Sequence, residues 1–310
     1  MKARYRSLGP HLREIFGCRV QRIALDAGLT CPNRDGSKGV GGCIYCNSRG
    51  SGTGLAATLS IPRQISLAKE RLARRYKAKR FIAYFQSFSN TYAPVETLRT
   101  LYHQALADPD VVGIAIGTRP DCVSPEVLDL LEELNQKTHL WVEYGLQSIH
   151  EATLKRINRG HSPEEFLRAV RKTRERGIEV VVHVILGLPG EDKSMMLHTA
   201  RVLGGLDIQG VKPHLLYVVE DTPLETLYRR EEYRPLEMEE YAEVLCEFLA
   251  LLPPSMVIHR LTGDPHPHEL VAPRWALKKR EVLNAINREL ERRDLWQGKW
   301  WERERLAEQP

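Results

Sequence analysis

The chain has 310 residues, of which 42% are hydrophobic and 27% are charged, and its formal net charge is +5. This composition excludes a mainly disordered chain and is sufficient for one large domain or two ordinary ones with a buried core. No stretch approaches the roughly 18 consecutive apolar residues of a membrane-spanning helix. The basic N-terminus is not followed by the apolar run of a signal peptide. We therefore expect a cytoplasmic protein whose six cysteines are reduced thiols.

Predicted strands and helices alternate along most of the chain. After a basic N-terminal arm at residues 1–17, apolar runs predict strands at 19–27, 80–88, 111–118, 140–146, 179–186 and 211–219. Amphipathic stretches predict helices at 62–79, 94–107, 124–137, 150–176 and 191–205. Nearly continuous apolar strands are typical of a parallel sheet covered by helices. We therefore predict an α/β fold in which residues 18–225 form a partial (β/α)6 barrel, with a doubly wound sheet as the alternative.

Two other segments are interpreted from their composition. Residues 50–54 are rich in glycine but lack the lysine of a phosphate-binding loop, so we expect a flexible loop there. After residue 225 the chain shows an apolar helical pattern at 236–252, a loop rich in Pro and His at 253–273, and a charged helical pattern at 274–296. We interpret residues 226–310 as a mainly helical C-terminal extension.

Three cysteines, Cys31, Cys43 and Cys46, lie in one Gly-rich loop directly after the first predicted strand. Converging thiolates repel one another unless a soft metal neutralises them. Loops that follow parallel strands are also where the active sites of β/α folds form. Structural zinc takes four closed ligands, often in closely spaced pairs, whereas the other three cysteines are isolated in the sequence. Three ligands leave an open coordination position, which favours a catalytic metal centre over a structural one.

This loop, with the aromatic Tyr45 before its last cysteine, resembles the cluster loop of the radical S-adenosylmethionine (SAM) superfamily. The long gap between the first two cysteines departs from the commonest spacing and resembles the Elongator-like branch. Further segments that resemble this branch follow in order at 118–121 (TRPD), 143–148 (EYGLQS), 158–161 (NRGH) and 183–191 (HVILGLPGE). The resemblance covers residues 18–225. Within this branch, the chain resembles a short bacterial group that lacks the acetyltransferase domain of Elongator's radical subunit.

The resemblance implies that Cys31, Cys43 and Cys46 hold a [4Fe–4S] cluster and that SAM chelates its fourth iron. In this superfamily, reduction of the cluster cleaves SAM to a 5′-deoxyadenosyl radical, which abstracts hydrogen from the substrate. The resemblance also implies a reductant protein, such as a flavodoxin or a ferredoxin, as a partner.

Residues at the strand ends are expected to surround SAM. By resemblance, Glu143 pairs with the SAM amino group, and Gln147 lies nearer the ribose. An unpaired carboxylate inside a barrel is costly, so Glu143 needs a cationic or hydrogen-bonding partner in any case. Arg156 or Arg159 is expected to pair with the SAM carboxylate. Further cofactor-binding residues are expected to be Tyr45, Gln86, Asn90, Thr91, His183 and Gly187.

Most of these residues also have a purely structural interpretation. Either arginine can be a residue of a helix surface, and His183 can be a hydrogen-bonded core histidine. The polar residues at 86–91 can form a simple turn, and Gly187 can belong to a plain strand-to-helix turn. Cys122 follows the 118–121 turn on the side where the active site is expected, so we interpret it as a hydrogen donor or second-site thiol, or as neither.

Two basic clusters are the only hint of a polyanionic partner in the composition. Residues 1–24 contain six Lys or Arg against one Glu, and residues 61–80 contain eight against one Glu. Such clusters suit RNA phosphates, although a solvated helix face explains them as well. With the resemblance, they favour tRNA as the substrate, modified at the carbon-5 side chain of the wobble uridine. The alternatives are a small molecule or tetrapyrrole as the substrate, or a metal-bearing RNA-binding module that is no enzyme.

Overall fold

The computed structural model describes residues 3–50 and 58–307 and contains a seven-stranded parallel sheet in the order β1-β2-β3-β4-β5-β6-β8. The predicted stretch 50–54 lies mostly outside the described residues. All six predicted strands are confirmed, with ends that differ by a few residues. They are β1 (Val20–Leu25), β2 (Arg80–Phe85), β3 (Val111–Thr118), β4 (His139–Gln147), β5 (Glu179–Leu186) and β6 (Gly210–Leu215).

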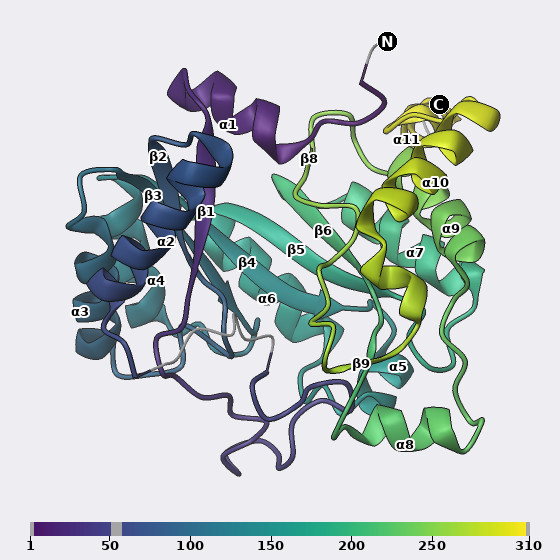
Figure 1. The fold of residues 1–310 in the computed structure, drawn as a ribbon, viewed down its shortest axis with the longest axis horizontal. Helices are drawn as coiled ribbons and strands as arrows, with labels where there is room; N and C mark the ends of the chain where they lie inside the picture. The colour runs from purple at the N-terminus through teal and green to yellow at the C-terminus, as the bar shows by residue number, and fades with distance from the viewer. Residues whose placement is uncertain (1–2, 51–57, 308–310) are drawn as a thin grey trace.

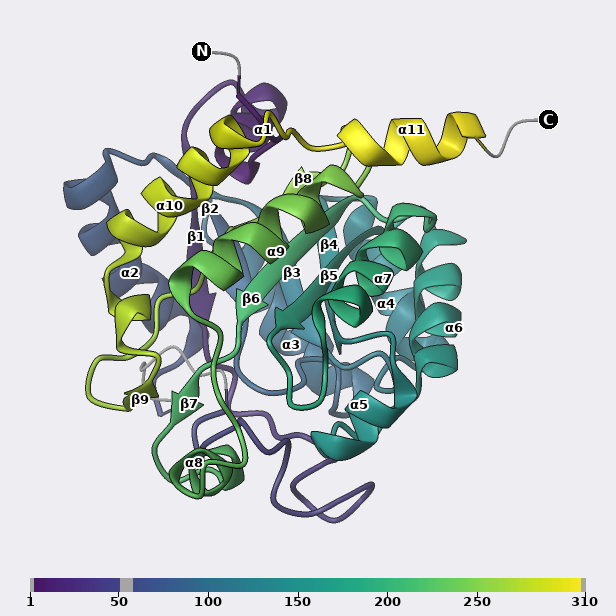
Figure 2. The ribbon, with the colours of Figure 1, turned by 90° about the vertical axis from the view of Figure 1, so that its right-hand side faces the viewer.

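The sheet curls into a half-barrel with helices on its convex face, which confirms the partial barrel (Figures 1 and 2). These helices bury apolar residues against the outer face of the sheet in one large core. Ser124 and Ser162 cap two of them, since each side chain accepts a hydrogen bond from a backbone N–H of the first turn. The helices along the core are α2 (Ile61–Tyr76), α3 (Val95–Leu106), α4 (Pro125–Asn135), α5 (Glu151–Arg156), α6 (Pro163–Arg174) and α7 (Lys193–Gly204).

The N-terminal arm is a folded part of the barrel. Its helix α1 (Leu8–Phe16) buries Leu8 and Leu12 in a cluster with the inward-facing Tyr84 and Trp141. The backbone before α1 also joins the fold, because the amide N–H of Ile258 donates to the carbonyl oxygen of Arg6. The arm therefore closes the end of the half-barrel at which the strands begin.

The C-terminal extension is mainly helical, as expected, but it also completes the sheet. Within the predicted loop 253–273, β8 (Val257–Ile258) pairs with β6 as the seventh strand, and β9 (Leu270–Ala272) pairs with β7 (Val218–Val219). The helices are α8 (Pro223–Arg229), α9 (Met238–Ala250), the 3-10 helix η1 (Arg274–Leu277), α10 (Lys279–Arg292) and α11 (Lys299–Ala307). Helix α9 packs against α7, α10 and β5, so the extension covers part of the sheet. No helix of the described residues has the length and apolar character to cross a bilayer.

Candidate active site

A cavity of about 480 Å³ opens at the end of the half-barrel where the parallel strands end. The loop after β1, the segment after β6 and the 263–270 segment of the extension line this cavity; Figures 1 and 2 show that end of the molecule. The volume of the cavity lies in the range of small-molecule and cofactor sites, about 300–1,000 Å³. The cavity therefore lies where the sequence places the active site of a β/α fold.

All three cysteines of the Gly-rich loop line this cavity, and Cys43 is the most deeply buried of them. The loop is fastened to the segment that follows β4 by reciprocal hydrogen bonds of two asparagines. The side-chain amide of Asn33 donates to the carbonyl oxygen of Asn158 at 2.5 Å, and that of Asn158 donates to the carbonyl oxygen of Gly42 at 2.7 Å. Gly42 has a φ of 79°, a conformation in which glycine is strongly favoured. Two elements far apart in the sequence thus hold the cysteines in place.

The TRPD segment at 118–121 supports the same loop. Arg119 is buried, pairs with Asp121 at 2.8 Å and donates to the carbonyl oxygen of Arg159 at 2.7 Å. Lys38 of the cysteine loop pairs with Asp121 at 2.8 Å. Burial alone would raise the pKa of Asp121, but Arg119 and Lys38 lower it to about 2. The segment therefore joins the end of β3 to the cysteine loop through the ion pair of Lys38 with the buried Asp121.

Arg159 is the cationic residue beside the cysteines. Its guanidinium lies 3.6 Å from the Sγ atom of Cys43 and donates to the carbonyl oxygen of Gly145 at 2.6 Å. A hydrogen bond with Cys46 and the charge of Arg159 lower the pKa of the Cys43 thiol well below its usual value, although burial opposes them. A Cβ atom at Gly145 would lie 2.6 Å from Arg159, so a glycine is needed where this side chain crosses the strand. The site thus favours a thiolate at Cys43, which is the form that binds metals.

The cysteines fit an iron–sulfur cluster better than a single metal ion. Three thiols of one loop line one cavity, and one of them lies beside a buried arginine. Among the described residues, no three or more His, Cys, Asp or Glu side chains are grouped so that they could hold one ion. A cluster does not require such a group, because each thiolate binds a different iron and the sulfurs lie farther apart.

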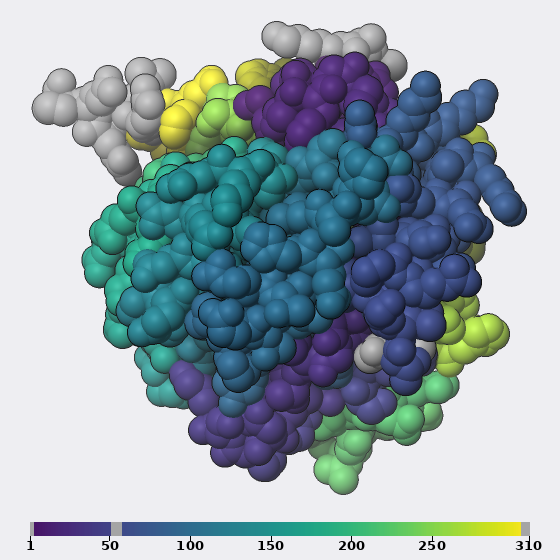
Figure 3. All heavy atoms as spheres, turned by 90° about the vertical axis from the view of Figure 1, so that its left-hand side faces the viewer, coloured from purple at the N-terminus to yellow at the C-terminus, as the bar shows by residue number. Residues whose placement is uncertain are grey.

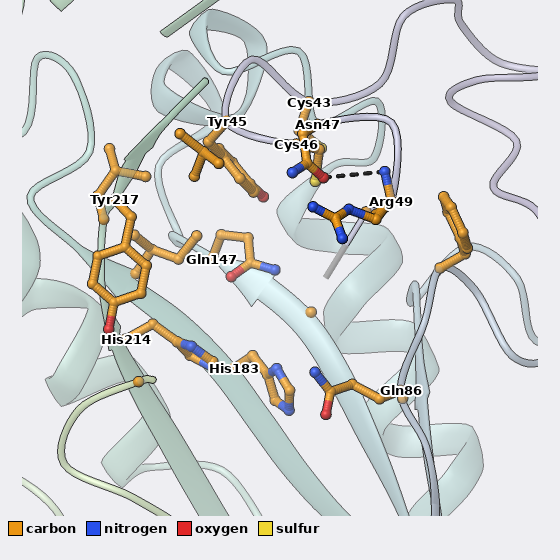
Figure 4. A pocket seen from close by; sticks show the side chains of 18 of the residues that line it. Cys43, Tyr45, Cys46, Asn47, Arg49, Gln86, Gln147, His183, His214 and Tyr217 are labelled. Carbon is orange, nitrogen blue, oxygen red and sulfur yellow. Dashed lines mark hydrogen bonds between the residues drawn. The ribbon is translucent and has the colours of Figure 1, made fainter. Parts of the chain in front are cut away.

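Of the residues predicted around SAM, six line the cavity: Tyr45, Gln86, Glu143, Gln147, Arg159 and His183. Figure 4 shows Gln147 between the cysteine loop, with Cys43 and Cys46, and the two histidines His183 and His214. Gln147 has a φ of 78°, which is unusual for a residue with a side chain and occurs at a register shift between β4 and β5. Such strained conformations cluster at functional sites.

The other predicted residues do not line the cavity. Asn90 and Thr91 are buried and hold the turn after β2 to the end of β3, because Asn90 donates to the carbonyl oxygen of Gly117 and Thr91 to that of Cys122. The Cys122 thiol lies 3.9 Å from Asp121, and burial raises its pKa to about 12, which keeps it protonated at neutral pH. The structural interpretation of these three residues is therefore the better supported one.

The same holds for one arginine and for the glycine after β5. Arg156 is exposed, and a Cβ atom at Gly190 would lie 2.1 Å from its guanidinium, so it covers the backbone of the 187–190 turn from outside. Gly187 accepts a hydrogen bond from the hydroxyl of Tyr233 at 2.9 Å, and Leu236 covers it. Of the two candidate arginines, only Arg159 reaches the cavity.

Glu143 has the partners that its burial requires, and they belong to the protein. It accepts hydrogen bonds from Nε1 of Trp141 at 2.9 Å, from Nε2 of His183 at 2.6 Å and from Nζ of Lys212 at 2.7 Å. Burial alone would raise the pKa of this carboxyl, but Lys212 and the histidines lower it well below its usual value. The SAM amino group is therefore not needed to pair this carboxylate, and its contact with Glu143 stays a prediction.

Sequence reasoning missed the basic and polar residues opposite the cysteines. Lys212, His214 and Tyr217 of the β6 segment and Arg260 after β8 all line the cavity. Lys212 and His214 alternate on an otherwise apolar strand, the same signal that singled out Glu143 and Gln147. Arg260 had no such signal, because it follows a two-residue strand inside a stretch predicted to be a loop.

The chain matches two models of known families along most of its length. Residues 31–203 match the Radical SAM superfamily, and residues 208–292 match the Radical_SAM C-terminal domain. It is 46% identical to "Uncharacterized protein YtqA" of Bacillus subtilis, over 97% of this chain and 94% of that protein. It is 30% identical to "tRNA uridine(34) acetyltransferase" of Methanocaldococcus infernus, over only 49% of this chain and 29% of that one.

Its fold is similar to that of a solved Elongator-type structure. The archaeal Methanocaldococcus infernus Elp3, with its first 46 residues deleted, matches with a TM-score of 0.69 over 90% of this chain and 64% of that one, at 19% identity. At this identity the likeness concerns the fold alone, whereas the superfamily model covers the three cysteines and the strands β2 to β5. The chain therefore belongs to the radical SAM superfamily, whose enzymes use a [4Fe–4S] cluster and SAM, and it resembles the Elongator-like branch.

Proposed function

We propose that this radical SAM enzyme modifies tRNA by abstracting hydrogen from the carbon-5 side chain of the wobble uridine. The observation that carries the proposal is the similarity to tRNA uridine(34) acetyltransferases over half of the chain. The matched proteins are much longer than this chain, which covers 29% of the one from Methanocaldococcus infernus. The similarity therefore supports a uridine of tRNA as the substrate. The proposal adds that the hydrogen is abstracted from the side chain on carbon 5 of that uridine.

We assign different roles in such a reaction to the residues that line the cavity. Cys31, Cys43 and Cys46 would hold the cluster, and Arg159 would balance the charge of the thiolates and of a SAM carboxylate. Gln147 and Gln86 present amides to the space between the cysteines and the strands, where SAM would be oriented. When bound, cluster and SAM together supply the abstraction of a hydrogen atom. A reductant protein such as a flavodoxin or ferredoxin would supply the electron.

A basic surface on α2 supports a polyanionic partner. Helix α2 and the turn after it carry exposed lysines and arginines, and this side of the molecule is shown in Figure 3. Lys69 and Arg80 are paired with Asp110, at 2.7 and 3.2 Å. Six others form no ion pair among the described residues and define what we call the α2 patch: Arg63, Arg71, Arg74, Arg75, Lys77 and Lys79.

The α2 patch is long enough for a macromolecule. The helix has 16 residues and runs opposite to the strands, from the cavity end of the barrel to the far end. At 1.5 Å per residue it spans about 24 Å, so its charges extend well beyond a small substrate. Part of the N-terminal arm is less available, because Arg4 pairs with Asp294 at 3.3 Å and Arg6 with Glu14 at 3.5 Å.

Nucleoside profiling of tRNA tests the proposal. Strains with and without the gene, and a strain with Cys43→Ala, are compared by mass spectrometry of digested tRNA. We expect a wobble-uridine nucleoside to accumulate as a precursor in both mutant strains, and anaerobic reconstituted enzyme to convert it with SAM and a reductant. An identical wobble-uridine profile in all three strains would remove tRNA as the substrate.

Charge reversal on the α2 patch tests the surface separately. Lys77→Glu should weaken tRNA binding and lower the slope of log K against log [salt] by about 1 if it removes one phosphate contact. Arg288→Glu is the matched control, because Arg288 is an exposed arginine of α10 without an ion pair among the described residues. Equal losses of affinity in the patch variant and the control would show that only the net charge matters.

A further inference from the structure

A group of charged side chains lies below the mouth of the cavity, on the inner face of the half-barrel. It comes from four places in the fold: Arg22 on β1, Glu143 on β4, Lys212 on β6 and Arg260 directly after β8. Lys212 precedes the end of its strand by three residues, and Glu143 precedes the end of its strand by four. At about 3.3 Å per residue, this places them about 10–13 Å below the strand ends. We call this group the cavity floor.

The cavity floor has more positive than negative charge. Glu143 is its one carboxylate among the described residues, with Lys212 at 2.7 Å and Arg22 at 3.7 Å. The nearby histidines are neutral at pH 7, because burial and the neighbouring cations lower the pKa of His183 to about 3 and that of His214 well below its usual value. Burial likewise lowers the pKa of Lys212 to about 7, against the pull of Glu143. One carboxylate thus faces three basic groups.

Arg260 is the basic group without a negative partner. Its Nε atom is buried and has no hydrogen-bond partner among the described residues, and Nη2 contacts the ring of the neutral His214. Glu143 is already occupied by three donors. The carboxylate of Asp264, four residues farther along, is bound by Lys279 at 2.7 Å through both oxygens. Within 3–50 and 58–307, no acidic side chain forms an ion pair with Arg260, and the charge of Glu143 acts on it only from beyond ion-pair distance.

An unneutralised guanidinium inside a protein is costly, so its presence here requires a compensating gain. Arg260 lines the same cavity as the cysteines, and the two histidines beside the floor lie across the cavity from Cys43 and Cys46 in Figure 4. A ligand that enters the cavity can therefore contact the Arg260 side chain without displacing the thiols. The missing partner is then a negative group of a bound molecule.

We propose that Arg260, with His214 and Lys212 beside it, binds a carboxylate of the substrate at the cavity floor. The planar guanidinium presents parallel N–H groups that match the two oxygens of a carboxylate. If the substrate is tRNA, this acid belongs to the carbon-5 side chain of the uridine, so this form of the inference rests on the function proposed above. The existence of the carboxylate site does not rest on it.

The first experiment uses acetate as the probe and the reconstituted enzyme saturated with SAM. Melting temperature is followed as sodium acetate replaces sodium chloride at constant ionic strength, with sodium phosphate as a second series. A molecule that binds only the folded state raises the melting temperature in a saturable way. We expect the acetate effect to saturate and to be at least as large as that of phosphate. No saturable effect of acetate, or a larger effect of phosphate, overturns the proposal.

Variants locate the acetate effect. A lost charge-assisted pair corresponds to about a 10- to 100-fold weaker half-saturation, which we expect for Arg260→Gln. Arg260→Lys keeps the charge but not the planar guanidinium. Its half-saturation concentration of acetate should lie between those of the wild type and of Arg260→Gln. Arg230→Gln is the control, because Arg230 is exposed and outside the cavity lining. Titrations of Arg260→Gln that match the wild type overturn the proposal, and the lysine variant covers the case in which the glutamine variant does not fold.

Two further measurements separate the possible sources of the carboxylate. If the site takes the substrate, SAM binds Arg260→Gln with an affinity within about twofold of the wild type; a loss of tenfold or more assigns the site to the SAM carboxylate and overturns the proposal. In turnover of tRNA, Arg260→Gln should raise KM by about 10- to 100-fold. Wild-type enzyme without any tRNA turnover would refute the proposed function, while the acetate series would still decide the carboxylate site.

Discussion

Replacing Glu143 by glutamine removes the one carboxylate of the cavity floor while keeping its shape. The Glu143 carboxylate is buried and lies 2.6 Å from His183, 2.7 Å from Lys212 and 2.9 Å from the indole nitrogen of Trp141. Glutamine retains one acceptor oxygen but introduces an NH2 group toward donors that have no lone pair to offer. The Lys212 ammonium, itself buried, then loses its carboxylate partner. We therefore expect a large loss of stability from this conservative change.

The size of the loss follows from the contacts. A hydrogen bond to a charged group contributes about 1.5–3 kcal/mol, and removing one partner of a buried ion pair costs about 3–5 kcal/mol. We expect Glu143→Gln to lower the free energy of unfolding by about 3–5 kcal/mol at pH 7, a large part of the usual total of about 5–15 kcal/mol. Lys212→Met alone should cost a similar amount, because it leaves the carboxylate short of its closest cation.

Urea denaturation of the two single variants and the double variant measures this pairing. The double variant should lose at least about 2 kcal/mol less than the sum of the single losses, because each single change leaves the other charge unpaired. Glu175→Gln, at an exposed position, is the control and should change stability by less than about 0.5 kcal/mol. Additive effects, or a loss below about 1 kcal/mol for Glu143→Gln, would contradict the role of this carboxylate as the centre of the floor.

Three further predictions concern the cysteine loop. Cys43→Ala should abolish iron–sulfur absorbance and formation of 5′-deoxyadenosine, whereas Cys18→Ala, outside the cavity lining, should retain both; retained turnover without Cys43 would show that the loop does not hold the cluster. Arg159→Gln should lower the rate of SAM cleavage at least about tenfold, and the exposed Arg156→Gln should stay within twofold of the wild type. Asp121→Asn should cost about 2 kcal/mol at pH 7, from a pKa lowered from 3.8 to about 2. Because the folded-state pKa is the lower one, this cost should be present above pH 4 and disappear as the pH falls toward 2, and a cost that persists at low pH would refute it.

The core of the fold could be predicted because its signals are local. Each of the six strands is an apolar run, and helices such as α4 and α6 begin at a serine followed by proline, which is a signal readable from adjacent residues. The seventh strand could not be predicted in this way. β8 has two residues, and its pairing with β6 and contact with the backbone of Arg6 depend on where distant segments meet. A run that short has no periodicity of its own.

In the candidate site, too, residues with a local sequence signal could be predicted, and residues whose position depends on distant segments could not. The cysteines and the inward-facing Glu143 and Gln147 could be found from spacing and alternation, because the signal lies within one loop or one strand. The choice between Arg156 and Arg159 could not, because it depends on which side of a short helix end faces β4. Asn90 and Thr91 had the same composition as a ligand-binding turn, but the structure uses their hydrogen bonds to join two strands.

The C-terminal extension contributes to the cavity as directly as the core does. The core supplies the cysteines and Arg159, which we propose serve the cluster chemistry shared by the superfamily. The extension supplies Arg260, and its Glu269 accepts a hydrogen bond at 2.8 Å from Asn47, the residue after the last cluster cysteine. It also covers the sheet with α9, whose buried Phe248 belongs to the main core. Because both parts line the cavity, we propose that the extension determines which substrate the enzyme accepts, while the reaction depends on the core.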